Sequence, residues 1–142
     1  MRIKKIALIA SLMFFYGLTF AQAPQQNQSN QADETYTEDK TNINVTEAHS
    51  IFTIKLKSNP TTGYSWFLRD YNPNLIEPIK HNFVKSDSTL MGAPGYEVWV
   101  FRAKPQAFII PQQTTIRMVY TRPWQATDNG SQVIFHVFLQ GK

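Results

Sequence analysis

The sequence IFTIKLKSNPTTGYSWFL, residues 51–68, decides the fold class because it alternates, turns sharply and then alternates again. Phe52, Ile54 and Leu56 fall on one face of an extended chain, and polar residues occupy most of the positions between them. After the turn the two-residue period returns at positions 64, 66 and 68. This period is the repeat of a β-strand, so the stretch predicts two strands joined by a tight connection, the first with one solvated face.

The same alternation continues through the rest of the chain. It recurs at Ile116, Met118 and Tyr120, whereas the segments 98–101 and 133–139 are apolar on both faces apart from His136, which predicts central strands. No window keeps a helical stripe. Short strands with frequent turn signals predict an all-β fold, and both a sandwich and a barrel fit the pattern. The turn formers are Asn59-Pro60, Asn72-Pro73, Gly92 to Gly95, Pro111 and Asp128-Asn129-Gly130.

The first 23 residues have the pattern of a cleaved signal peptide. Arg2, Lys4 and Lys5 form a basic start, residues 6–20 are almost unbroken in apolar character, and Ala21-Gln22-Ala23 supplies a small-residue cleavage site. A transmembrane helix is the alternative, but the apolar run is shorter than the roughly 20 residues that cross a bilayer. We expect cleavage after Ala23 and an exported protein, periplasmic or secreted, that has no membrane contact once the signal is removed.

A polar segment follows the signal. Residues 24–40 are rich in Gln, Asn, Asp, Glu and Thr and have almost no apolar side chains, so they cannot bury enough surface to offset their conformational entropy. We therefore expect a flexible polar leader over 24–40 and one globular domain over 41–142.

Charge and cysteine content exclude further classes. The chain has 14 Lys and Arg against 10 Asp and Glu, and three of the basic residues belong to the signal, which leaves 11 against 10. A nearly neutral domain without a clustered basic face gives no basis for binding nucleic acid. Because the chain has no cysteine, an exported domain must be held by its hydrophobic core and not by disulfides.

The residues that carry catalysis are scarce. There is no cysteine nucleophile, and His49, His81 and His136 are isolated from one another without the spacing of a zinc site. His136 lies in an apolar strand, where a hydrogen-bonded core or rim histidine is the ordinary interpretation. No glycine-rich phosphate loop occurs. We expect neither enzymatic activity nor a cofactor or metal.

The turn within the opening stretch is more specific than a spacer requires. Its proline fixes φ, its glycine permits a positive φ, and its two threonines can bond to the local backbone, so the loop should be stiff. An ordinary hairpin turn is the alternative, but consecutive threonines at a rigid tip favour a binding role. The residues are Asn59, Pro60, Thr61, Thr62, Gly63 and Tyr64.

Two later loops share this character. Arg122-Pro123-Trp124 places a large aromatic after a strand, where it either folds back onto the domain edge or is exposed, and exposed Trp and Arg often dominate binding energy. The second is a flexible apolar loop, residues 90–96, whose glycines would let a partner's backbone approach closely. Its central residues are Gly92, Ala93, Pro94 and Gly95.

Taken in this order, the three loops resemble those of the chagasin-like family, inhibitors of papain-like cysteine proteases. The first loop matches the family motif at every position, and so does the third, with Tyr120 two residues before Arg122. The middle family motif is usually Gly-x-Gly-Gly, whereas this chain has Pro94 at the third position, which removes a backbone donor. The resemblance covers roughly residues 41–142 and implies an immunoglobulin-like β-sandwich of about seven to eight strands with all three loops at one end.

The resemblance also implies a function. The protein would be a reversible, competitive inhibitor of papain-like (C1 family) cysteine proteases such as papain and cathepsin L-type enzymes, and would act as a monomer. Thr61 and Thr62 with Gly63 would lie over the catalytic cysteine, Arg122 and Trp124 would pack on the primed side, and residues 92–95 would contact the non-primed side. The alternative from another class is an immunoglobulin-like adhesion or periplasmic ligand-binding module.

Overall fold

The structure, a computed structural model, describes residues 34–88, 90, 92–125 and 130–141. The expected signal peptide and residues 24–33 of the expected leader lie outside this range. Eight strands and two short 3₁₀ helices make up the described part: β1 Thr35–Tyr36, β2 Asn42–Val45, β3 Ile51–Ser58, η1 Pro60–Thr62, β4 Ser65–Tyr71, β5 Ile76–Lys85, β6 Gly95–Ala103, η2 Pro105–Phe108, β7 Gln112–Thr121 and β8 Ser131–Leu139. No helix among these residues is both long and apolar enough to cross a bilayer.

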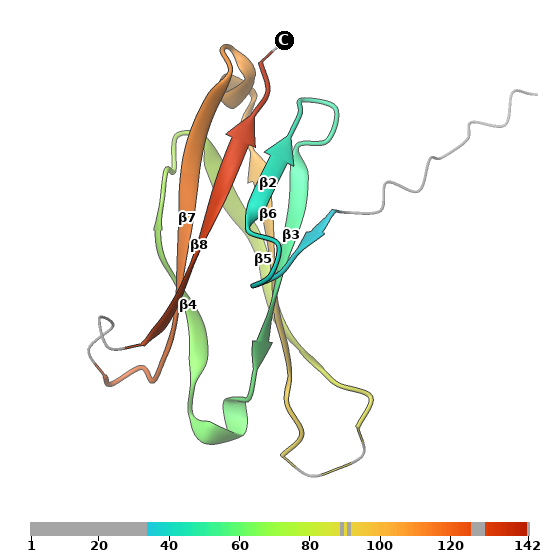
Figure 1. The fold of residues 1–142 in the computed structure, drawn as a ribbon, viewed down its shortest axis with the longest axis vertical. Helices are drawn as coiled ribbons and strands as arrows, with labels where there is room; N and C mark the ends of the chain where they lie inside the picture. Colours follow the sequence, from blue (N-terminus) through green and yellow to red (C-terminus); the bar gives the residue numbers. More distant parts are fainter. Residues whose placement is uncertain (1–33, 89, 91, 126–129, 142) are drawn as a thin grey trace, which may run out of the picture. The chain divides into compact units, whose positions relative to one another are not determined.

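The strands form two four-stranded sheets that face each other (Figure 1). One sheet has the order β1-β3-β6-β5 and the other β2-β8-β7-β4, and all pairs are antiparallel except β1 with β3 and β2 with β8. The expectation of an all-β, immunoglobulin-like sandwich of seven to eight strands is confirmed, and a barrel is excluded because the two sheets remain separate. Both segments predicted to be central, in β6 and β8, have a strand on each side.

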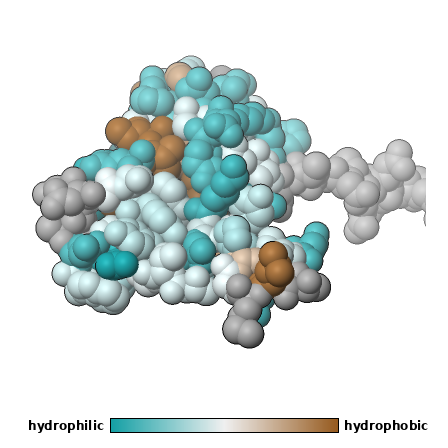
Figure 2. Space-filling view, turned by 60° about the horizontal axis from the view of Figure 1, so that its bottom comes forward, coloured by the Kyte–Doolittle hydropathy of each residue, from teal (hydrophilic) through white to brown (hydrophobic). Residues whose placement is uncertain are grey.

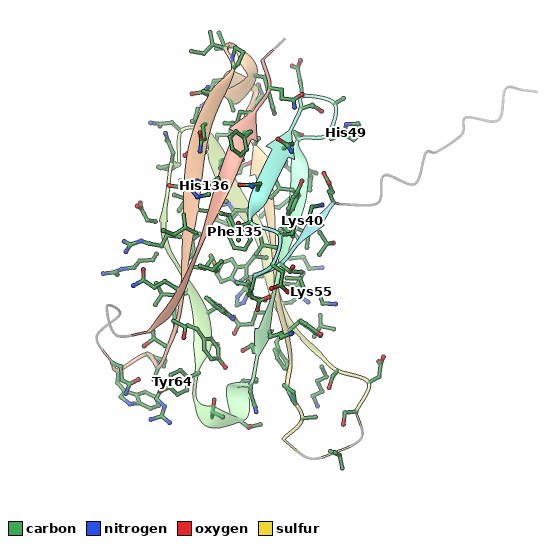
Figure 3. The ribbon with its side chains drawn as sticks, viewed as in Figure 1. Lys40, His49, Lys55, Tyr64, Phe135 and His136 are labelled. Carbon is green, nitrogen blue, oxygen red and sulfur yellow. The ribbon has the colours of Figure 1, made fainter. Side chains whose placement is uncertain are left out.

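The core lies between the sheets and is built from the alternating residues of the opening stretch and its counterparts. Phe52, Ile54 and Leu56 are buried on β3, and Phe101 of β6 stacks on Phe52 with ring centroids 5.6 Å apart. Figure 3 shows Phe135 of β8 about half-way along the sandwich, inside the space between the sheets. The described part contains no disulfide, so this burial supplies the main stabilisation of the domain.

The folded domain begins earlier than the sequence predicts. Strand β1 pairs with the edge of β3 in the register Thr35 with Thr53 and Tyr36 with Ile54, and the Tyr36 side chain is 1% exposed. Burial and a hydrogen bond to Glu34 raise the pKa of Tyr36 to about 12. The leader prediction therefore fails for residues 34–40, because one buried tyrosine and a short ladder suffice to dock this polar segment.

Strand directions place three connections at the same end of the sandwich. These are the connections β3 to β4, β5 to β6 and β7 to β8. Strands β3, β5 and β7 run toward this end, and the strand that follows each of them runs in the opposite direction. In Figure 1 they form the lower end of the domain, opposite the C-terminus. We call them the tip loop (59–64), the glycine loop (86–94) and the tryptophan loop (122–125, its described part).

Candidate functional site

The tip loop is a single 3₁₀ turn that is capped at both ends. Asn59 precedes the turn, and its side-chain oxygen accepts from the Thr61 backbone N–H and hydroxyl. The Thr62 hydroxyl donates to the Asn59 carbonyl over 2.7 Å, and Gly63 ends the turn at φ +79° while its N–H donates to the Pro60 carbonyl. Asn59 is thus an organiser of the loop, while Thr61 and Thr62 form its exposed tip.

Side chains of β7 and the tryptophan loop hold the tip loop from one side. The Tyr120 hydroxyl accepts the Asn59 backbone N–H at 2.9 Å, and the Tyr120 ring stacks on Tyr64 with centroids 5.4 Å apart. The Arg122 guanidinium lies over the Tyr64 ring at 4.7 Å and its Nε donates to the Thr62 carbonyl at 3.3 Å. Figure 3 shows Tyr64 at the loop end, on the side of the tryptophan loop. Tyr64 and Arg122 therefore connect two loops that are about 60 residues apart in sequence.

Trp124 is exposed and does not fold back into the domain edge. Its side chain is 73% exposed, and its ring reaches the tip loop, because a Cβ placed on Gly63 would lie 3.4 Å from the Trp124 ring. Pro123 is exposed beside it. An exposed indole held against a rigid turn is the kind of side chain that dominates an interface, since it offers a large area with few rotatable bonds.

The described residues of the glycine loop form fewer bonds to their surroundings than those of the tip loop. The Asn59 side-chain amide donates to the Gly92 carbonyl at 3.4 Å, and Gly92 has a φ of +78°. Leu90 is 77% exposed, Pro94 is exposed and Ala93 is half-buried. A shallow hollow of about 420 Å³ separates this loop from the tip loop, with Pro60, Thr61, Phe83 and Leu90 among the residues that line it.

Gly95 does not belong with the other candidate residues. It is buried as the first residue of β6, paired with Lys85, and a Cβ there would lie 2.4 Å from the Val84 carbonyl oxygen and 2.5 Å from the Phe83 ring. The sequence suggested a contact residue because glycines in loops admit a partner. The structure instead uses this glycine for the close approach of β5 and β6.

Figure 2 brings the loop end forward and shows a mainly pale or hydrophilic surface, with hydrophobic side chains in two small, separate areas. This end of the domain combines turns that expose their backbone with the exposed indole of Trp124 and the guanidinium of Arg122. Across the residues that the structure describes, no group of three or more His, Cys, Asp or Glu could hold a metal ion. The arrangement is suited to inserting stiff loops into a groove.

Sequence reasoning missed a buried acidic residue directly beneath the tip loop. Glu97 lies on β6, is 2% exposed, and accepts hydrogen bonds from both ends of the tip loop. A signal for it existed, because the two-residue period that runs through Trp99 and Phe101 places Glu97 on the same inward face.

Comparison with known sequences gives a consistent family. The model described as Chagasin family peptidase inhibitor I42 matches residues 45–137. Chagasin of Trypanosoma cruzi is 30% identical over 91 residues, a match that covers 61% of this chain and 77% of chagasin.

Solved structures show the same fold. The crystal structure of the cysteine protease inhibitor EhICP2 from Entamoeba histolytica matches with a TM-score of 0.62 at 18% identity, over 75% of this chain and 95% of that protein. The solution structure of amebosin matches with a TM-score of 0.57 at 24% identity, over 75% of this chain and 97% of amebosin. At these identities the structural matches support the fold alone, and membership of the family rests on the sequence matches.

Proposed function

Because the chain belongs to the chagasin family and is a cysteine protease inhibitor, not an enzyme, we propose that it blocks papain-like proteases by inserting its three loops into the active-site cleft. The observation that carries this proposal is the joined pair of loops at one end, in which Arg122 bonds to the carbonyl of Thr62 beside the exposed Trp124. The adhesion or ligand-binding alternative has no support in these comparisons.

In this proposal Thr61, Thr62 and Gly63 lie over the catalytic cysteine of the protease. Trp124 and Arg122 contact the primed side of the cleft, and the glycine loop, through Gly92 to Pro94, contacts the non-primed side. A loop that already has its bound conformation loses little conformational entropy on docking. Ordering of the loop therefore offsets little of the free energy gained from the contacts with the protease.

The tip geometry favours a reversible plug over a slow substrate. A peptide that binds by strand addition is extended, whereas Pro60–Thr62 forms a 3₁₀ turn whose two threonine hydroxyls both donate to Asn59. A turn held in this way does not present a peptide bond in an extended pose for attack by the catalytic cysteine, and the proposal needs no covalent step. The inhibition is then competitive, and the inhibitor leaves the protease intact.

We further propose that the protein is exported through its first 23 residues, to the periplasm or the medium, and acts as a monomer. The basic start, the apolar run and the Ala21-Gln22-Ala23 site support export. A single loop end that enters a cleft needs no second copy. N-terminal sequencing of the exported protein tests the cleavage site, and sedimentation of the complex tests its one-to-one stoichiometry.

The experiment that tests the function is a titration of the protein from Pro24 onward into papain and a cathepsin L-type enzyme with a fluorogenic peptide, with trypsin as the serine-protease control. We expect competitive loss of cysteine-protease activity alone, with recovery on dilution and no cleavage of the inhibitor by intact mass. A folded sample that leaves both cysteine proteases active would overturn the proposed target class.

A further inference from the structure

A buried carboxyl group lies between the two sheets, directly beneath the tip loop. Glu97 is on β6, two residues after the glycine loop joins the sheet at Gly95, and it is 2% exposed. Burial of a carboxyl group is costly unless its oxygens are hydrogen-bonded, so such a residue in a core of this size calls for a specific reason.

The bonds of Glu97 converge on the ends of the tip loop. Its Oε1 accepts from the Ser58 hydroxyl at 2.7 Å, the Ser65 hydroxyl at 3.1 Å and the Trp66 backbone N–H at 2.9 Å. Ser58 is the last residue of β3, and Ser65 and Trp66 are the first two residues of β4. One oxygen therefore ties the start of the tip loop to its end, across strands that belong to different sheets.

The second oxygen of the Glu97 carboxyl group contacts β5 and not the ends of the tip loop. Oε2 lies 3.0 Å from Nε2 of His81 on β5, and the His81 ring stacks on Trp99 with centroids 3.9 Å apart. His81 thereby fixes the rotation of the carboxyl group, so that Oε1 stays directed at the tip loop. The indole N–H of Trp66 adds a separate tie, a bond of 2.8 Å to the Lys57 carbonyl.

We propose that Glu97 is a positioning residue of the inhibitory end. Its Oε1 fixes the distance between Ser58 and Ser65, and thereby the position of the tip loop relative to Trp124. The inference rests on the proposed function. Glu97 touches no partner, because it lies beneath the loops and is buried, so it acts through the residues it holds. An apolar side chain of similar size would fill the same space and keep the core packed, but it would leave the two serine hydroxyls and the Trp66 N–H without their shared acceptor.

The test uses two substitutions at this position in the purified protein. Glu97→Leu removes all acceptors. Glu97→Gln keeps one carbonyl oxygen that can face the serines while its amide N–H₂ faces His81. We expect Glu97→Leu to raise the inhibition constant against papain by about tenfold, the equivalent of roughly 1.4 kcal/mol, and Glu97→Gln to stay within about threefold of the unsubstituted protein.

Two control variants separate positioning from general stability. Val45→Ala creates a cavity in the core at the opposite end, where Val45 pairs with Leu139, and lowers the melting temperature without touching the loops. Glu77→Leu removes an exposed carboxyl group that pairs with Arg102, also far from the loops. Both should inhibit as well as the unsubstituted protein at temperatures below their melting transitions.

Amide hydrogen exchange at Thr62 and Gly63 gives a readout that needs no protease. Both N–H groups are bonded within the tip loop, to the Asn59 and Pro60 carbonyls, and should exchange faster in Glu97→Leu but not in Val45→Ala. If Glu97→Leu does not fold, the double variant Ser58→Ala with Ser65→Ala removes the same bonds from the other side.

The inference is overturned if Glu97→Leu inhibits normally with unchanged exchange in the tip loop, or if Glu97→Gln loses as much inhibition as Glu97→Leu. It is also overturned if Val45→Ala weakens inhibition in proportion to its melting temperature. If the unsubstituted protein inhibits neither papain nor a cathepsin L-type enzyme, the proposed function fails, and the exchange rates alone then decide whether Glu97 positions the tip loop.

Discussion

The tip loop and the glycine loop leave the same end of the sandwich, but they are held in different ways. The tip loop is closed by its own threonine bonds, capped by Asn59, and joined to the tryptophan loop through Arg122. Among the residues of the glycine loop that the structure describes, Gly92 accepts one long hydrogen bond from the tip loop, from the Asn59 amide to its carbonyl, and Leu90 is 77% exposed.

This difference suggests a division of roles between the loops when they bind a protease. A loop fixed by many bonds presents one shape and loses little entropy on binding, whereas a loop with few bonds can adapt at an entropic cost. We expect the tip and tryptophan loops to set the affinity common to all targets. The glycine loop should then set the differences between one protease and another. The predictions below test this division, in order of decreasing effect.

The largest effect is expected for Trp124→Ala. Removing an indole that is 73% exposed in the free protein should cost at least about 2 kcal/mol of binding, roughly 30-fold in the inhibition constant, with an unchanged melting temperature. Inhibition assays and calorimetry measure the two quantities. Ile109→Ala is the matched control, because Ile109 is 75% exposed at the opposite end. Equal inhibition by both variants would contradict the division.

The next effect compares glycines in the two loops. Gly63 and Gly92 have almost the same φ, +79° and +78°, so alanine is strained at both. At Gly63 the new methyl group also meets the Trp124 ring at 3.4 Å, whereas at Gly92 the nearest contact is the Thr61 hydroxyl at 3.9 Å.

We therefore expect Gly63→Ala to weaken papain inhibition by about tenfold, roughly 1.4 kcal/mol, and Gly92→Ala by about threefold or less, because the less restrained loop can relax. Parallel titrations on the same protease measure both. A larger loss from Gly92→Ala than from Gly63→Ala would show that the glycine loop is the more restrained of the two.

A smaller effect is expected for Tyr120→Phe, which removes the hydroxyl that accepts the Asn59 N–H. The ring stays stacked on Tyr64, so only the hydrogen bond is lost, at a cost of about 1 kcal/mol. This predicts about a fivefold weaker inhibition and a similar decrease in the free energy of unfolding measured in urea. Unchanged values in both measurements would mean that the bond does not hold the tip loop.

The smallest effect is expected for Pro94→Gly, which restores the usual family residue in the glycine loop. A glycine there enlarges the set of conformations that must be given up on folding and on binding, by about 0.4–1 kcal/mol. We expect inhibition of papain to weaken by about twofold, because the entropic cost is shared between folding and binding, and titrations against a panel of cysteine proteases measure the change for each enzyme. Tighter inhibition of every member of the panel would contradict this account of Pro94.

Sequence patterns anticipated the features that depend on local chemistry. The alternation around Phe52 and Ile54 predicted β3, and the two-sided apolar segments predicted the central strands β6 and β8. The stiffness of the tip loop followed from Pro60 and Gly63, which set φ directly. These features could be predicted because neighbours in the sequence determine them.

The features that were missed depend on residues far apart in the sequence. Glu97 shares the inward-facing period of Trp99 and Phe101, but its own surroundings do not identify what satisfies its carboxyl group, because its partners Ser58 and Ser65 are more than 30 residues away. Tyr36 is one aromatic in a polar segment, and only the open edge of β3 makes it a core residue. Gly95 was assigned to a loop because the residues next to it in the sequence do not reveal that β5 approaches it closely.

The docking of β1 on β3 has a practical consequence for building sensors and affinity resins from this domain. Thr35 pairs with Thr53, five residues before β3 ends at Ser58, so a linker attached ahead of residue 34 joins the domain about 17 Å from the inhibitory end, at roughly 3.3 Å per residue. The docked strand also pairs with the β3 edge at Thr53 and Ile54, which shortens the stretch of free backbone groups that this edge offers to another chain. Immobilisation through the N-terminus should therefore leave the loops facing the solution.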